Sequence, residues 1–243
     1  MTASALQHYE RHLAPVYSWM AGGIESALGR GQDELTEIGV SNRGARYAVD
    51  LGAGFGMHAI PLARTGCRVL AVDSSAILLE ELKAHANALP VTAVQVDLLE
   101  FPRHLAGRPD IVLCMGDTLT HLPDLSAVTT LIARVAEHLS AGSRFVLTFR
   151  DYSEALKGPN RFIPVKSDET RILTCSIEYD EATVQVHDIL HEFSQGAWAM
   201  RASAYRKLRL VPAWVTEQLE KFGFVVEVGV GLSGMTRICA ERA

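Results

Sequence analysis

The sequence predicts an α/β fold, with a doubly wound, mostly parallel seven-stranded sheet, an N-terminal helical cap and an antiparallel β insert. Between residues 45 and 149, short apolar runs such as RYAVDLG, CRVLAVD and DIVLCMG alternate with segments whose apolar residues return every three or four positions. Apolar strands alternating with amphipathic helices are typical of a parallel sheet covered on both faces. Because crossovers between parallel neighbours are nearly always right-handed, helices should cover both faces.

The flanking segments have different patterns. Residues 1–40 are expected to form the helical cap, with a break at Gly22-Gly23 before a second helix. Residues 41–150 form the α/β core, and residues 151–210 show the period-two alternation of an antiparallel meander, as in RILTCSIEYD and ATVQVHDILHEF. Residues 211–243 complete the core with one helix, VPAWVTEQLEKFG, and two final strands.

Composition excludes several classes of protein. A chain of 243 residues predicts one large domain or one domain with an insert. Its 23 basic and 28 acidic residues argue against nucleic-acid binding by bulk attraction. No apolar run is long enough for a membrane span, and the polar start does not resemble a secretion signal, so a cytoplasmic protein is expected. The four scattered cysteines are expected to be small buried hydrophobes rather than disulfides or metal ligands: Cys67, Cys114, Cys175 and Cys239.

The strongest motif is DLGAGFG at residues 50–56, which follows a strand and precedes a helix. Its glycines allow a tight turn and close approach of a ligand, and the helix start offers free N–H groups. Asp73 ends the next strand and can accept both hydroxyls of a ribose. Asp97 ends the strand after that and could accept from an exocyclic amine. Together these residues predict a nucleoside site, and a tight turn without any ligand is the alternative.

Two nucleoside cofactors could use this layout. A dinucleotide site needs G-x-G-x-x-G, but Met57 occupies the third glycine position, which disfavours a dehydrogenase. The spacing G-x-G-x-G after the acidic Asp50 resembles the class I S-adenosylmethionine-dependent methyltransferases, whose sheet is Rossmann-like. The resemblance implies S-adenosylmethionine as cofactor and S-adenosylhomocysteine as product. In that family the glycine loop passes under the methionyl part, and acidic residues matching Asp73 and Asp97 hold the ribose hydroxyls and the adenine amine.

The N-terminal segment resembles the family's cap helix, whose aromatic residues often lie over the cofactor. A ring face or phenol oxygen can stabilise the sulfonium region, whereas simple helix packing is the alternative. His8 and His12 are four residues apart, but no third metal ligand is evident, and no metal is expected. The resemblance therefore implies these cofactor contacts: Tyr9, Tyr17, Asp50, Gly52, Gly54, Gly56, Asp73, Ser74, Asp97, Leu98, Met115 and Gly116.

Residues 110–122 resemble the GNSxxHL motif of glycine and sarcosine N-methyltransferases, with Asp117 in place of Asn. The FRDY segment at 149–152 resembles the HRNY segment of the same enzymes. This implies that Arg150 anchors a substrate carboxylate, with Asp117 and Tyr152 beside it, and an Arg fork suits such a group. An ion pair at the sheet edge is the alternative. The charge of Asp117 is expected to favour a cationic or polar substrate, and His121 is the candidate base or orienting residue.

The insert resembles lids that roof the cavity of small-molecule methyltransferases and can carry a homodimer contact. On its predicted strand, His187 and His191 share one face, and Asp188 and Glu192 share the other. A histidine could act as a base if the first face lines the cavity. Otherwise the pair belongs to a polar outer face, which we favour.

Three functions remain open. The leading hypothesis is methyl transfer to a nitrogen or oxygen of a small molecule, with no nucleic-acid or membrane partner. The second is a non-catalytic protein that binds S-adenosylmethionine and docks a partner through the insert. A cavity with Arg150 pointing into it would favour the enzyme, and an exposed apolar surface on the insert would favour the binding protein. An RNA methyltransferase is disfavoured by the excess of acidic residues. Amino-methylating DNA enzymes carry a Pro-Pro-aromatic clamp after their fourth strand, and the absence of this clamp from residues 110–122 also argues against a nucleic-acid substrate.

Overall fold

The core is a seven-stranded sheet with the order β10-β11-β5-β4-β1-β2-β3. The computed structural model describes residues 5–40 and 44–243, so residues 1–4 of the expected cap and residues 41–43 of the expected core lie outside the described residues. The strand β11 runs antiparallel to its neighbours β5 and β10, whereas β1 to β5 pair in parallel. The predicted fold class is confirmed. The strands are β1 (Tyr47–Leu51), β2 (Arg68–Asp73), β3 (Val91–Gln95), β4 (Ile111–Cys114), β5 (Arg144–Phe149), β10 (Phe224–Val230) and β11 (Thr236–Arg242).

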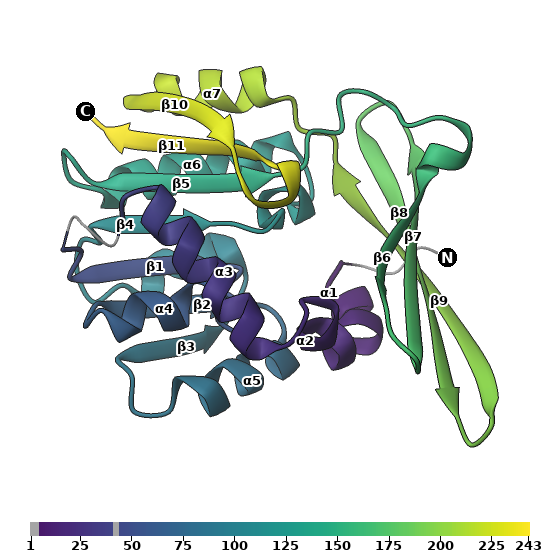
Figure 1. Ribbon diagram of the computed structural model, residues 1–243. Helices are drawn as coiled ribbons and strands as arrows, with labels where there is room; N and C mark the ends of the chain where they lie inside the picture. Colours follow the sequence, from purple (N-terminus) through teal and green to yellow (C-terminus); the bar gives the residue numbers. More distant parts are fainter. Residues whose placement is uncertain (1–4, 41–43) are drawn as a thin grey trace.

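Helices cover both faces of this sheet (Figure 1). On one face, α3 (Ile24–Glu37), α4 (Ala59–Arg64) and α5 (Ala76–Ala86) bury apolar residues against the strands. On the other, α6 (Leu125–His138) and α7 (Pro212–Lys221) do the same. Side-chain caps fix two of these helix starts, because Ser75 accepts the Leu78 N–H and Asp124 accepts the Ala127 N–H. The carboxyl ends of the parallel strands are thereby held at one edge.

The insert is a separate four-stranded antiparallel sheet, as the alternation predicts, with the order β6-β7-β8-β9. It comprises β6 (Phe162–Ser167), β7 (Arg171–Tyr179), β8 (Thr183–Ser194) and β9 (Ala197–Leu208). Asp188 is buried on the inner face of β8, whereas His187 lies on the outer face beside Glu178, with 3.3 Å between Nε2 and Oε2. The histidine pair therefore lies on the outer face, as we favoured, but this face also carries exposed apolar side chains and is not purely polar.

The N-terminal segment is not one helix but a series of short turns between the core and the insert (Figure 1). It consists of α1 (Ala5–His8), a π-helical turn (Tyr9–Leu13), a 3₁₀ turn (Ala14–Val16) and α2 (Tyr17–Met20). Proline at position 15 lacks an N–H donor, which is incompatible with a continuous helix here. The segment packs Leu13 and Val16 against the insert, and His8 lies 2.9 Å from Asp188 and 2.8 Å from Ser203.

The four cysteines are free thiols, and three of them are fully buried. Within residues 5–40 and 44–243, no three His, Cys, Asp or Glu side chains gather as a metal site would require. Among these described residues, no helix is long and apolar enough to cross a membrane.

Candidate active site

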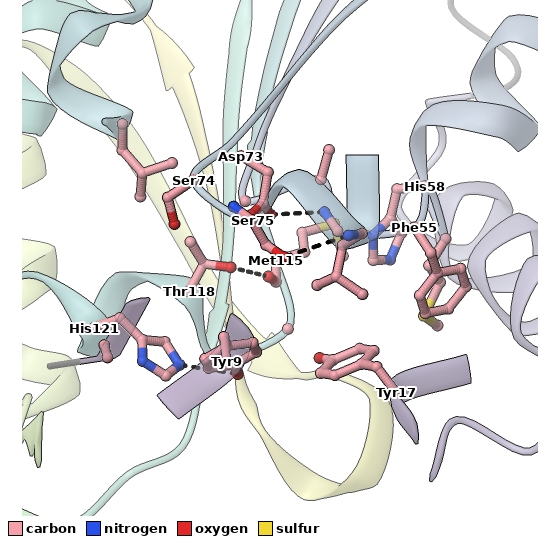
Figure 2. A pocket seen from close by; sticks show the side chains of 18 of the residues that line it. Tyr9, Tyr17, Phe55, His58, Asp73, Ser74, Ser75, Met115, Thr118 and His121 are labelled. Atoms are coloured by element: carbon pink, nitrogen blue, oxygen red, sulfur yellow. Dashed lines mark hydrogen bonds between the residues drawn. The ribbon is translucent and has the colours of Figure 1, made fainter. Parts of the chain in front are cut away.

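A cavity of about 230 Å³ opens at the carboxyl ends of β1, β2 and β4, with the N-terminal segment forming its opposite wall (Figure 2). Tyr9 and Tyr17 lie across the cavity from Asp73 and Ser74 (Figure 2). Ten of the residues predicted from sequence line it: Tyr9, Tyr17, Gly52, Gly54, Asp73, Ser74, Leu98, Met115, Gly116 and His121.

The glycine loop crosses the end of β1 in a conformation that side chains disfavour. Gly52 has φ +75, and its N–H donates to the carbonyl of Val72 over 2.8 Å. A Cβ atom at Gly52 would overlap with Thr118, whereas one at Gly56 would press against Ile60. Gly56 does not line the cavity, so its role is close packing of the loop on α4 and not the ligand contact that the resemblance implied.

Asp73 joins the loops that follow β1 and β2. Its Oδ2 accepts the N–H of Gly54 and its Oδ1 accepts the N–H of Ser75, each over 2.8 Å. Burial raises the pKa of this carboxyl group, although the backbone donors of Ser75, Gly54 and Ser74 oppose the shift. A carboxylate has about four lone-pair directions, so acceptor capacity stays available for a hydroxyl group of a ligand.

Asp50 lies beneath the loop rather than on the cavity wall. Burial raises its pKa to about 6, although the charge of His58 and the N–H of Ala59 both act to lower it. Its Oδ2 has no hydrogen-bond partner. His58 does line the cavity, and its Nε2 lies 3.0 Å from the Oε2 of Glu34 in α3. The acidic residue of the motif therefore supports the loop from below, which corrects its assignment as a cofactor contact.

Tyr9, Tyr17 and His121 form an aromatic wall on the side facing the N-terminal segment. The Tyr9 hydroxyl is 3.4 Å from Nε2 of His121, and the ring centroids of Tyr9 and Tyr17 are 5.9 Å apart. Burial, and then the charge of Lys207, lowers the pKa of His121 to about 3. Its Nδ1 is buried without a hydrogen-bond partner. This imidazole is therefore neutral near pH 7 and retains unused hydrogen-bonding capacity.

Asp117 does not present a free negative charge to the cavity, contrary to our expectation. It lies outside the cavity lining, and the ammonium of Lys207 donates to its Oδ2 over 2.6 Å. The N–H of Arg150 donates to Oδ1 over 2.9 Å, and the Tyr152 hydroxyl donates to Oδ2 over 3.4 Å. Although burial opposes it, Lys207 holds the pKa of Asp117 below its ordinary value. The charge that we expected to select a cationic substrate is neutralised within the fold.

Three further assignments from sequence are not supported. The side chain of Arg150 is exposed and does not line the cavity, so the expected carboxylate anchor is absent from the wall. Tyr152 is buried against the insert strands rather than in the cavity. Asp97 is also outside the lining, and its side chain caps the next turn by accepting the N–H of Leu99 over 2.8 Å. The neighbouring Leu98 does line the cavity.

Sequence reasoning missed several residues of the site. Thr118, Phe55, Ser75 and His58 line the cavity and are labelled in Figure 2, and each belongs to a loop next to a predicted motif. Lys207 was missed because it comes from the insert. Its position among the alternating inward residues of β9 was the available signal, since a lysine facing inward needs a buried partner.

The comparisons with known proteins agree with this geometry. A family model described as a methyltransferase domain matches residues 48–142. The match covers the α/β core and supports a methyltransferase domain there. Glycine N-methyltransferase of Oryctolagus cuniculus is 28% identical over 70% of this chain and 64% of its own length. Glycine/sarcosine N-methyltransferase of Halorhodospira halochloris is 30% identical over 48% of this chain and 44% of its own length. The resemblance recognised from the motifs is confirmed.

Solved structures share the fold across nearly the whole chain. DesVI of Streptomyces venezuelae superposes with a TM-score of 0.80 at 17% identity, covering 97% of this chain and 100% of its own. The CcbJ methyltransferase of Streptomyces caelestis has a TM-score of 0.77 at 23% identity, with 97% of each chain covered. The insert and the N-terminal segment therefore belong to the shared architecture. By contrast, this chain spans less than two thirds of the two curated relatives named above.

The residues at the cavity fit S-adenosylmethionine. Asp73 has free acceptor capacity for a ribose hydroxyl, and Leu98 supplies an apolar surface in the same cavity. Tyr17 presents an aromatic ring to the cavity, and a ring of this kind would stabilise a sulfonium (Figure 2).

Proposed function

We propose that this protein transfers a methyl group from S-adenosylmethionine to the amine nitrogen of a small molecule. The observation that carries the proposal is a cavity with a nucleoside-type end at Asp73 and a neutral aromatic end at Tyr9 and His121. N-methyltransferases among the relatives support nitrogen over oxygen as the acceptor atom.

When bound, the cofactor supplies the electrophilic methyl group, so the protein must position the acceptor and exclude water. The N-terminal segment forms one wall of the cavity, which supports a small acceptor. Tyr9 and His121 would orient the acceptor nitrogen by hydrogen bonding, since the imidazole is uncharged and can accept a hydrogen bond. An amine that binds as the free base needs little further activation.

The exposed position of Arg150 argues against a free amino acid as the acceptor. No arginine or lysine is among the residues that line the described cavity, so a carboxylate next to the amine would lack a partner there. We therefore expect an acceptor without an adjacent carboxylate, although the named relatives act on glycine.

The test is methyl transfer from isotopically labelled S-adenosylmethionine to a panel of amines, phenols and amino acids, followed by mass spectrometry. We expect a product from amines that lack an α-carboxylate, and a strong reduction of its rate in the Tyr9→Phe and His121→Asn variants. Arg150→Ala should retain the wild-type rate. A rate that falls in Arg150→Ala alone, with glycine as the best acceptor, would reverse the assignment of the acceptor class.

A second candidate function is favoured by the outer face of the insert. Trp198 and Met200 are 49% and 65% exposed there, next to Phe193. An exposed apolar surface of this kind favours a protein that binds S-adenosylmethionine and docks a partner. It equally supports the homodimer expected from the family resemblance. Cofactor binding without turnover on any acceptor would support the docking role.

A further inference from the structure

A buried ion pair ties the loop that carries His121 to the insert. Asp117 belongs to the loop after β4 and Lys207 to β9, and their side chains meet over 2.6 Å with only 4% and 8% of each residue exposed. Asp117 also has φ +75, a left-handed conformation that non-glycine residues rarely adopt. Such a conformation persists when the surroundings fix it from several sides.

The same strand places an aromatic ring against His121. Tyr205 lies two residues before Lys207 on the same face, and its ring is parallel to that of His121 with centroids 5.5 Å apart. The Lys207 ammonium is 5.5 Å from the centroid of the Tyr205 ring. Tyr9 meets both rings edge-on, at 5.3 Å from His121 and 6.1 Å from Tyr205. His121 is thus held between the insert and the N-terminal segment.

The charged and titratable groups that face His121 come from every element around it. They are Lys207 and Tyr205 of β9, Asp117 of its own loop, and His8 and Tyr9 of the N-terminal segment. After burial, the charge of Lys207 has the largest effect on the pKa of His121 and lowers it, whereas the charge of Asp117 raises it. Without Lys207, the carboxylate of Asp117 would be the dominant neighbour of the imidazole.

We propose that Lys207 is a positioning residue of the acceptor site, which fixes the loop through Asp117 and keeps the imidazole of His121 uncharged and able to accept a hydrogen bond. The value of this arrangement for methyl transfer rests on the function proposed above. The insert contributes no residue to the lining of the described cavity, yet through Lys207 it acts on a residue of the cavity wall. With the imidazole uncharged and Asp117 paired with Lys207, this side of the cavity offers no unpaired carboxylate to a protonated amine, so the site selects the acceptor as its free base.

The experiment follows the ring nitrogens of His121 by NMR, with ¹⁵N-labelled histidine and His121→Asn for assignment. The variants are Lys207→Met, Lys207→Arg and the double variant Lys207→Met with Asp117→Asn. Lys166→Met is the matched control, since this lysine lies on β6 of the same insert. We expect His121 to stay neutral between about pH 5 and pH 8 in the wild type, Lys207→Arg and Lys166→Met.

In Lys207→Met, we expect His121 to titrate within that range, because Asp117 is left unpaired, and we expect the double variant to restore the neutral ring. The proposal is overturned if His121 titrates near its ordinary pKa in the wild type, a result that does not depend on the folding of any variant. It is also overturned if the folded Lys207→Met variant keeps His121 neutral. Calorimetry with S-adenosylhomocysteine separates the two proposals, because failure of the wild type to bind would refute the proposed function and leave the NMR result valid.

Discussion

The carboxylate of Asp73 accepts the backbone N–H of Gly54 over 2.8 Å, which joins the acidic end of β2 to the glycine loop after β1. One side chain thus fixes the shape of the loop and keeps free lone pairs for a ribose. The two strongest motifs of the sequence are parts of one hydrogen-bonded unit.

Replacing Asp73 with Ala should weaken binding of S-adenosylhomocysteine at least about tenfold, since each hydrogen bond to a charged group contributes about 1.5–3 kcal/mol. Isothermal titration calorimetry measures the effect. Glu80→Ala, an exposed carboxylate on α5, is the control and should bind as the wild type does. An unchanged dissociation constant in Asp73→Ala would place the ribose elsewhere.

Two glycines of the cavity wall should differ sharply in their tolerance of a methyl group. Gly52 and Gly116 both have positive φ, at +75 and +74, so alanine costs about 1–2 kcal/mol of backbone strain at either position. Only at Gly52 would the new Cβ atom also overlap with Thr118, because nothing lies within 4 Å of the corresponding position at Gly116. Urea denaturation should therefore show a larger loss of stability for Gly52→Ala. Equal losses would contradict the close approach of the two loops.

Features that depend on residues close together in sequence were predicted correctly, whereas contacts between distant parts of the chain were not. The sheet, the insert and the glycine loop were predictable because periodicity and turn residues are local signals, and the cavity contains Gly52, Gly54 and Asp73 as expected. The partner of Asp117 was not predictable, because Lys207 is 90 residues away and reaches it only through the docking of the insert. Arg150 was assigned from a motif match, and a motif does not determine which way a side chain leaves the strand end.

The N-terminal segment shows a second limit of local patterns. Apolar spacing predicted a helix, but the segment is a chain of short turns whose shape depends on contacts with the insert. His8 is an example, because its ring stacks on Tyr205 with centroids 4.0 Å apart and bonds to Asp188. Pairing of this kind depends on two elements far apart in sequence, which no pattern within the segment records.

The stability of the protein should depend on the titration of Asp50. Its folded pKa of about 6 lies above the ordinary value of 3.8, so the folded protein retains a proton that the unfolded chain releases. The associated stabilisation is complete below about pH 4 and is lost as the pH rises through about 6. Asp50→Asn should therefore gain stability relative to the wild type across this window, by an amount on the order of 3 kcal/mol above pH 6. Urea denaturation at several pH values measures the difference, with Asp33→Asn on the surface of α3 as a control that should show none.

The outer face of the insert should hold two copies of the chain together. Strand register places Ile172, Met200, Phe193 and Trp198 on this one face, and the rings of Phe193 and Trp198 lie 5.3 Å apart. A surface with several exposed apolar side chains is costly in water, and an isologous contact between two such faces would bury all of them. Sedimentation velocity should give the mass of a dimer for the wild type and of a monomer for Trp198→Glu. Val225→Glu on β10, which changes an exposed valine far from the insert, should remain a dimer. A monomeric wild type would instead leave this face to a different partner, as the docking role requires.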